Sequence, residues 1–210
     1  MICRPSCAPS SGRLRSGALF DLAGRVALVT GAGRGLGAAM AAALAAAGAD
    51  LILWGRQVPL LRRQAERVRR LGRRALAQRV DVTDHAAVHS ALREALRTFG
   101  RLDILINNAG IWRGDEALSL SRRAWDEVLE TDYTAVFFVS QAVARVMARR
   151  RYGKIITVSS TSGVMALAHN AAYGSAKAAL FHLTRILALE WGPLGIRVML
   201  VEPSGFRTDW

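Results

Sequence analysis

Short apolar runs alternate with longer amphipathic stretches along the chain from Asp21 onward. Each apolar run has the length of one strand and is apolar at nearly every position, a pattern typical of a parallel sheet covered on both faces. The stretches between the runs have helical length and spacing, and several end at a glycine, which favours the end of a helix. The predicted strands are 25–30, 50–54, 75–80, 102–107, 154–159 and 196–201, and the predicted helices are 36–48, 58–72, 84–100, 121–151 and 172–192, with stops at Gly48, Gly72, Gly100 and Gly192.

This alternation predicts an α/β fold in which one doubly wound parallel sheet is built with right-handed crossovers. The pattern continues without an internal repeat or a second domain over 21–210. Residues 1–20 are rich in Ser, Pro, Gly and Arg and lack acidic residues, so we interpret them as a disordered extension or a mis-called start, with a transit peptide as the alternative. Because ligands of such sheets bind beyond the carboxyl ends of the strands, we expect the chemistry just after each strand.

Composition and charge exclude several classes of function. A chain of 210 residues with 51% hydrophobic and 21% charged residues fits one globular domain, and no apolar run is long enough to span a membrane. The net charge of +13 would suit a polyanion, but the arginines are scattered along helices without aromatic residues that stack on bases, so we expect no nucleic-acid partner. The two cysteines, Cys3 and Cys7, are too few for a disulfide framework, which favours a reducing compartment, the cytoplasm. His85 and His89 lack a third ligand, so we predict no metal site.

The segment TGAGRGLG, residues 30–37, follows the first predicted strand and turns directly into a helix. Glycines let the backbone approach a pyrophosphate, and the helix N-terminus supplies N–H groups, so dinucleotide binding is favoured over a plain glycine-rich turn. The second strand leads to Arg56 with no acid to bind the ribose hydroxyls. Arg56 and Arg34 could instead hold a 2′-phosphate, which favours NADP(H) over NAD(H). The alternative is that Arg56 is incidental in an arginine-rich chain.

A second candidate site lies in AAYGSAKAAL, where Tyr173 and Lys177 are four residues apart and share one helix face. Lys177 is one of only two lysines among 29 basic residues. A neighbouring ammonium favours the phenolate form, which makes a tyrosine useful as an acid or base. The YxxxK spacing also occurs by chance as a surface pair. Here, however, the helix follows Ser159 and Ser160 at the end of a predicted strand, where a hydroxyl can bind a substrate carbonyl.

Taken in order, these motifs resemble the short-chain dehydrogenase/reductase family over residues 20–210. The matches are TGxxxGxG, the intact NNAG at 107–110, a serine 13 residues before the tyrosine, YxxxK, and the aspartate of VDVTD. The resemblance implies a Rossmann-type fold and the candidate catalytic residues Ser160, Tyr173, Lys177 and Asp132. It implies cofactor binding by Thr30, Gly31, Arg34, Gly35, Leu36, Gly37, Arg56, Asp81, Val82, Asn108, Ala109, Gly110, Tyr173, Lys177, Pro203 and Thr208.

The resemblance also implies roles and partners. Tyr173 would exchange a proton with the substrate oxygen, Ser160 would position that oxygen, and Lys177 would bind the nicotinamide ribose. Within the family the chain looks most like gluconate 5-dehydrogenases and 3-oxoacyl-carrier-protein reductases. The implied activity is hydride transfer between NADP(H) and a carbonyl or secondary alcohol, with a keto-sugar acid, a 3-oxoacyl group or a similar substrate. A homodimer or homotetramer is implied, with helices 121–151 and 172–192 at the subunit interface.

Two positions depart from the family pattern. Asp132, in TDYTAVF, stands where the family has an asparagine thought to hold a proton-relay water. A carboxylate cannot donate a hydrogen bond, and its charge near Lys177 would partly cancel the effect of the lysine on Tyr173, so we expect an altered relay.

The second departure is at the end of the chain. Pro203-Ser204 replaces the family's PG step, and relatives continue through a substrate lid and a further strand, which we expect to be lacking here. The departures leave an alternative, a non-catalytic or impaired dinucleotide-binding protein. Trp112 and His169 are pocket-wall candidates, with plain loop residues as the alternative.

Overall fold

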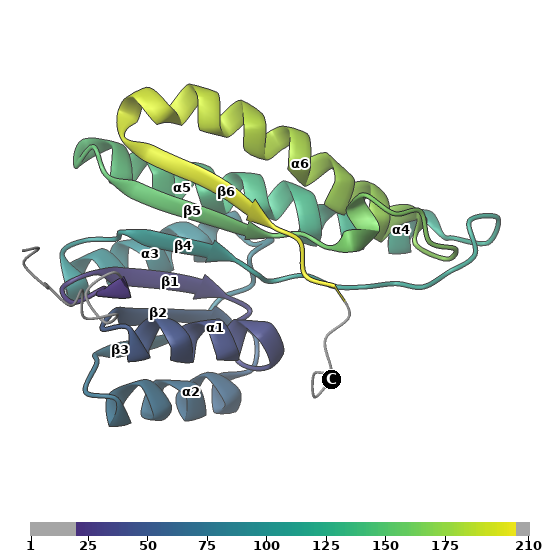
Figure 1. Ribbon diagram of the computed structural model, residues 1–210. Helices are drawn as coiled ribbons and strands as arrows, with labels where there is room; N and C mark the ends of the chain where they lie inside the picture. The colour runs from purple at the N-terminus through teal and green to yellow at the C-terminus, as the bar shows by residue number, and fades with distance from the viewer. Residues whose placement is uncertain (1–19, 205–210) are drawn as a thin grey trace, which may run out of the picture.

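Six parallel strands form one sheet in the computed structural model, which describes residues 20–204 (Figure 1). The strand order is β3-β2-β1-β4-β5-β6. Strands β1 to β3 extend toward one edge of the sheet and β4 to β6 toward the other, so the topological switch point lies between β1 and β4. This switch point is where doubly wound sheets bind ligands. The strands are β1 Val26–Thr30, β2 Asp50–Gly55, β3 Ala75–Arg79, β4 Ile104–Asn107, β5 Gly153–Val158 and β6 Ile196–Val201. The predicted doubly wound α/β fold is confirmed.

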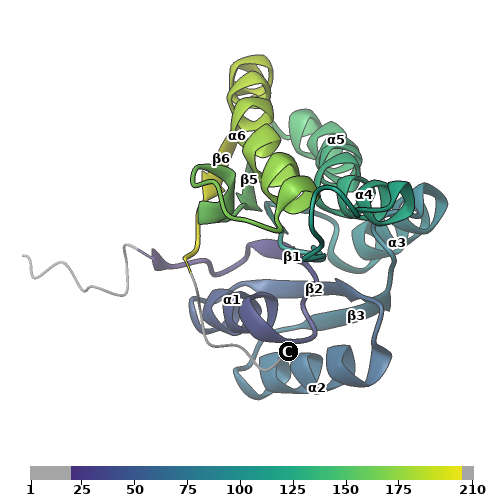
Figure 2. The same cartoon turned by 90° about the vertical axis from the view of Figure 1, so that its right-hand side faces the viewer.

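Helices cover both faces of the sheet (Figure 2). One face packs against α1 and α2, and the other against α3, α5 and α6. Short helical turns at Glu130–Thr134 (π), Thr161–Gly163 and Gly192–Leu194 (both 3₁₀) complete the fold. The helices are α1 Gly35–Ala46, α2 Val58–Arg70, α3 His85–Phe99, α4 Arg122–Leu129, α5 Ala135–Arg149 and α6 Ala171–Trp191. Within residues 20–204, none of these helices is long and apolar enough to cross a membrane.

The central strands are apolar at successive positions because both of their faces are buried. In β1, Ala27 and Val29 pack toward α1 and α2, while Val26 and Leu28 join the core beneath α3 and α5. Burying both faces removes the alternation that a half-exposed strand would show. The side chain of Trp54 at the end of β2 is fully buried, and its Nε1 donates to Gln78 Oε1 on β3 at 2.7 Å.

The predicted strand 102–107 is wrong at its start, since β4 begins at Ile104. The carboxylate of Asp103 accepts the N–H of Val26 at 2.9 Å, and its backbone also bonds to the Val26 carbonyl and the Lys154 N–H, each at 2.9 Å. Arg101 binds the same carboxylate through two nitrogens at 2.6 and 2.7 Å. A bidentate arginine beside a buried carboxylate is a strong, directional contact. Asp103 therefore fixes the amino ends of β1 and β4, away from the site.

One further boundary prediction is corrected. The stretch predicted as a single helix over 121–151 is helical from Arg122 to Arg149, but the π turn at Glu130–Thr134 separates α4 from α5. Gly192 is the C-cap of α6, as predicted, but its φ is −53° and the chain continues as a 3₁₀ turn. The left-handed residue that ends this 3₁₀ turn is Gly195, with φ of 79°. Gly48, Gly72 and Gly100 do have the positive φ expected of helix stops.

Candidate active site

Thr30 joins the carboxyl ends of β1 and β4. Its Oγ1 accepts the N–H groups of Asn108 at 2.9 Å and Ala109 at 3.0 Å, and donates to the Ile106 carbonyl at 3.3 Å. The amide of Asn108 in turn donates to the carbonyls of Thr30 and Gly31 at 3.0 and 3.3 Å. The glycine loop and the NNAG segment, far apart in sequence, therefore form one hydrogen-bonded unit at the switch point.

The glycine loop has the shape of a cradle for a phosphate group. Gly31 and Gly35 have φ of 63° and 53°, a left-handed conformation that favours glycine. A Cβ on Gly31 would lie 2.9 Å from Asn108 Nδ2, and a Cβ on Gly37 would collide with the Gly31 carbonyl. The loop leads into α1, whose N-cap residue Arg34 accepts no N–H through its side chain and whose first turn holds no acid. With no side-chain cap among the described residues, the N–H groups of this first turn and the close backbone fit a pyrophosphate.

The residues predicted for the adenine side lie at the same edge of the sheet. Arg34 and Arg56 are exposed beyond the adjacent strands β1 and β2. Asp81, just after β3, accepts the N–H of Thr83 at 3.1 Å and its hydroxyl at 2.8 Å through Oδ1. Val82 is partly buried against the core beneath α3. The three strand ends thus present two cations and one carboxylate to a common edge.

Ser160 begins the 3₁₀ turn that follows β5, and its Oγ accepts the N–H of Ser162 at 3.2 Å. This turn packs tightly against α6. A Cβ on Gly163 would lie 2.9 Å from the backbone of Lys177, and a Cβ on Gly174 would lie 3.0 Å from the Ser162 carbonyl. The close approach of the two backbones brings the Ser160 turn against the segment of α6 that carries the YxxxK motif.

The ammonium of Lys177 is buried beneath Tyr173. The Lys177 residue is 5% exposed, and Nζ lies 5.3 Å from the centre of the Tyr173 ring. Nζ donates to the Val158 carbonyl at 3.3 Å, and the Lys177 carbonyl accepts the hydroxyl of Ser159 at 3.0 Å. The end of β5 therefore holds both the side chain and the backbone of this lysine.

Asp132 lies in the π turn with no exposed surface and pairs with Lys177, as expected from the sequence. Its Oδ2 is 3.0 Å from Lys177 Nζ, and its Oδ1 accepts the Ile111 N–H at 2.7 Å. Burial raises the pKa of Asp132 above its ordinary value, against the opposing effects of Lys177 and the Ile111 N–H. Oδ2 has no well-aligned hydrogen bond among the described residues, so its contact with Lys177 is an ion pair without a hydrogen bond.

Two contacts in and near the site carried no signal in the sequence. Buried Asn107 donates to Ser140 Oγ on α5 at 2.8 Å, which ties the end of β4 to the helix layer. Trp112, which is 58% exposed, donates through Nε1 to Asn170 Oδ1 at 2.7 Å. This bond joins the loop after β4 to the start of α6. Both depend on residues more than 30 positions apart, for which no spacing rule exists.

The other predicted residues have different surroundings. The Pro203 carbonyl accepts the Thr161 N–H at 3.3 Å, which ties the end of β6 to the Ser160 turn. His85 packs its ring 4.5 Å from that of Phe138. His169 is exposed and has a left-handed φ of 61°. Thr208 lies outside the described residues, as do 1–19 of the predicted N-terminal extension. Residues 20–204 hold no group of three metal-ligating His, Cys, Asp or Glu side chains.

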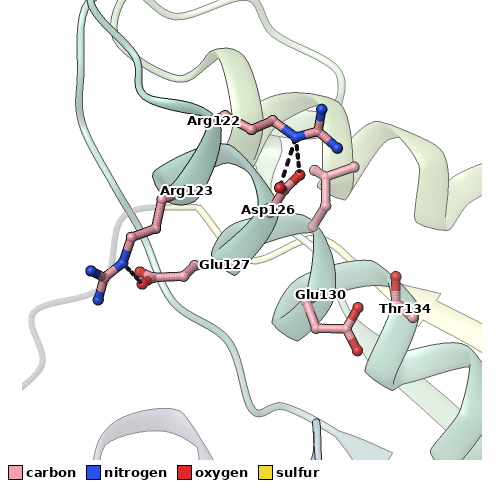
Figure 3. Close-up of a pocket in the computed structure, with 7 residues that line it drawn as sticks. Arg122, Arg123, Asp126, Glu127, Glu130 and Thr134 are labelled. Atoms are coloured by element: carbon pink, nitrogen blue, oxygen red, sulfur yellow. Dashed lines mark hydrogen bonds and ion pairs between the residues drawn. The ribbon is translucent and has the colours of Figure 1, made fainter.

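A shallow hollow of about 860 Å³ lies on the outer side of α4 and the π turn (Figure 3). Ion pairs join Arg122 to Asp126 at 2.7 Å and Arg123 to Glu127 at 3.0 Å along its wall. These are exposed pairs between residues four apart on one helix, which contribute little to stability. Since neither Ser160 nor Tyr173 lines this hollow, we do not assign it to the site.

Comparison with known proteins agrees with this geometry. The sequence profile described as short chain dehydrogenase matches residues 25–210. The gluconate 5-dehydrogenase of Gluconobacter oxydans is 40% identical over 191 residues, which cover 91% of this chain and 75% of that protein. The 3-oxoacyl-[acyl-carrier-protein] reductase of Escherichia coli is 38% identical and covers 90% and 77%.

Solved structures show the same fold. The crystal structure of a putative short-chain alcohol dehydrogenase from Sinorhizobium meliloti has a TM-score of 0.87 and 40% identity, covering 90% of this chain and 75% of that one. A putative gluconate dehydrogenase from Agrobacterium tumefaciens has a TM-score of 0.87 and 38% identity, covering 90% and 75%. The chain therefore belongs to the short-chain dehydrogenase family, NAD(P)-binding oxidoreductases that act on CH–OH groups.

Proposed function

We propose that the protein is an NADP(H)-dependent oxidoreductase that interconverts a carbonyl and a secondary alcohol. The observation that carries this proposal is the buried ammonium of Lys177, 5.3 Å from the Tyr173 ring and beside the Ser160 turn. A buried cation beside a phenol serves no packing need, because an apolar side chain would fill the same space at lower cost. It does favour the phenolate, and so prepares Tyr173 for proton transfer.

The three side chains have distinct roles in the proposed reaction. When bound, the nicotinamide supplies the hydride for carbonyl reduction or accepts it in the reverse direction. During reduction Tyr173 gives its hydroxyl proton to the carbonyl oxygen while the carbon accepts the hydride. Ser160 donates a hydrogen bond to that oxygen, and Lys177 binds the nicotinamide ribose and stabilises the resulting phenolate. Asp132 acts on the reaction through Lys177, 3.0 Å away.

The preference for NADP(H) is supported by the charges beyond β1 and β2. Arg34 and Arg56 lie at adjacent strand ends, and β2 ends without an acid. A guanidinium binds a 2′-phosphate well, whereas an NAD site places a carboxylate at the end of this strand. Titrations that follow the fluorescence of the reduced nicotinamide compare the two cofactors directly. Tighter binding of NADH than of NADPH would contradict the preference.

The substrate is proposed from the relatives and from the loops around Tyr173. Gluconate 5-dehydrogenase and 3-oxoacyl-[acyl-carrier-protein] reductase point to a keto-sugar acid or a 3-oxoacyl group. The loop after β4 and the loop before α6 bear exposed apolar side chains, which favour a substrate with an apolar chain next to its reactive carbonyl. These side chains are Trp112, Val164, Met165 and Leu167. A panel of 3-oxoacyl thioesters and keto-sugar acids separates the two classes.

Tyr173→Phe tests the catalytic assignment. We expect turnover to fall by about 10²–10⁴-fold, because the hydroxyl that exchanges the proton is lost. Cofactor affinity should change little, since the ring and Lys177 remain. Tyr133→Phe, on the π turn, is the matched control and should keep wild-type turnover. Activity that survives in Tyr173→Phe contradicts the assignment.

The alternative proposal is a dinucleotide-binding protein with impaired chemistry, which the pairing of Asp132 with Lys177 favours. It predicts tight cofactor binding together with no turnover across the whole substrate panel. We also propose a homodimer or homotetramer, supported by apolar residues exposed on α6, namely Ile186 and Leu189. The cytoplasmic location stays a prediction from cysteine usage.

A further inference from the structure

The ammonium of Lys177 has three N–H donors, and it is held by one hydrogen bond and one ion pair. The Val158 carbonyl lies 3.3 Å from Nζ on one side, and Asp132 Oδ2 lies 3.0 Å away on another. Among the described residues only the Val158 carbonyl accepts a hydrogen bond from Nζ, so donors remain for the ribose of a bound cofactor. These two contacts hold the Lys177 side chain in one position.

The carboxylate of Asp132 is fixed as firmly as its partner. The Ile111 N–H holds Oδ1 at 2.7 Å, and the residue has no exposed surface. A Cβ on Gly110 would lie 2.8 Å from Oδ2, so the glycine makes room for this oxygen beside the loop after β4. Three segments, namely that loop, the π turn and α6, thus meet at a single buried ion pair.

We propose that Asp132 is a positioning residue that holds Lys177 in a direct ion pair and so sets the pH range in which Tyr173 works. This rests on the proposed role of Tyr173. A lone ammonium would favour the phenolate strongly, but an ammonium balanced by a carboxylate 3.0 Å away does so less. An amide of the same shape keeps an acceptor for Lys177 and removes the negative charge. The phenolate should then form at lower pH.

Within residues 20–204, neither Asp132 nor Lys177 forms an ion pair with a third group. The loop after β4 has no titratable side chain between Asn107 and Ile111. β5 contacts the pair through the Val158 carbonyl, and the lysine of that strand, Lys154, lies at its opposite end. The neighbouring titratable side chains are Tyr173 on α6 and Tyr133, next to Asp132 on the π turn.

The remaining nearby charges lie further out. Glu127 on α4 pairs with Arg113 and Arg123, and His169 is exposed in the loop before α6. Glu130 lines the hollow beside α4 and the π turn (Figure 3). The change expected on removing the charge of Asp132 is therefore assigned to Lys177 and Tyr173.

Asp132→Asn tests the proposal through two readouts. The ultraviolet absorbance of tyrosinate is titrated in wild type and variant, each with and without Tyr173→Phe, so that the Tyr173 contribution is isolated. Alcohol oxidation is measured across the same pH range. We expect both the Tyr173 titration and the rise of oxidation rate to move to lower pH by about one unit. Asp126→Asn, an exposed aspartate on α4, should move neither.

The two readouts separate this proposal from the function on which it rests. An unmoved titration in a folded Asp132→Asn protein overturns the proposed role of the ion pair, whatever the turnover. A shifted titration in a protein that turns over no substrate supports the pair and contradicts the oxidoreductase activity. If thermal unfolding shows that Asp132→Asn is not folded, Asp132→Ser gives the same test with a smaller neutral side chain and the same expected direction.

Discussion

At the scale of single residues, Lys177 and Asp132 depend on one another for stability as well as chemistry. Each is almost wholly buried, and each is the nearest opposite charge of the other. Breaking such a pair by removing one partner leaves an uncompensated charge in the interior. Lys177→Met should therefore lower the free energy of unfolding by about 3–5 kcal/mol near neutral pH.

This deficit should depend on pH in a definite direction. Burial raises the pKa of Asp132, and Lys177 opposes that rise, so the pKa climbs further when the lysine is removed. The folded variant then binds a proton more readily than the unfolded chain does. Its stability improves relative to wild type as pH falls toward the ordinary carboxyl range. Urea unfolding at a series of pH values measures this, with Lys154→Met as control. A deficit that is constant with pH would contradict the argument.

Sequence reasoning predicted which candidate residues lie near one another better than it predicted the contacts between them. Spacing alone placed Tyr173 and Lys177 on one helix face, and the expected closeness of Asp132 to Lys177 is confirmed at 3.0 Å. The bond between Asn107 and Ser140 could not be predicted, because it depends on how β4 and α5 pack. Local rules cover residues within a turn or two, whereas such contacts follow from tertiary packing.

At the scale of elements, the strands and most helices followed from hydrophobic pattern, but the π turn did not. Val128, Asp132 and Ala135 are all buried and have the i, i+4, i+7 spacing of an ordinary helix. The spacing of buried positions therefore gives no sign of the wider turn. The pattern therefore predicts a helix through this stretch and says nothing of its hydrogen bonding. π turns often occur at functional sites, and this one carries Asp132.

The contact between the Ser160 turn and α6 gives the next prediction. A Cβ on Gly163 would lie 2.9 Å from the Lys177 backbone, and backbone cannot move aside as a side chain can. Gly163→Ala should cost about 1–3 kcal/mol in stability and should lower turnover by shifting Ser160 relative to Tyr173. Gly192→Ala is the matched control, since it has an ordinary helical φ and open space around it. Thermal melting and turnover, measured together, decide the matter. Wild-type values for Gly163→Ala would show that the close packing has no consequence.

At the scale of the whole molecule, the sheet brings the site together from segments far apart in sequence. The loops after β1, β4 and β5 meet at one edge because all six strands are parallel and their carboxyl ends lie together (Figure 1). The sequence predicts this arrangement, because each motif lies just after a predicted strand. Which loops touch, as Trp112 and Asn170 do, depended on the full fold.

The outer surface of α6 gives a prediction about assembly. Leu189 is 79% exposed and Ile186 39%, one helical turn apart on a helix whose other face is packed against the sheet. Apolar residues grouped on a helix surface favour association with another chain. Leu189→Arg should therefore shift the protein from an oligomer toward the monomer in sedimentation velocity. Leu118→Arg places the same charge on a fully exposed loop leucine and should leave the sedimentation profile unchanged. If wild type and Leu189→Arg sediment alike, this face of α6 does not form the subunit contact.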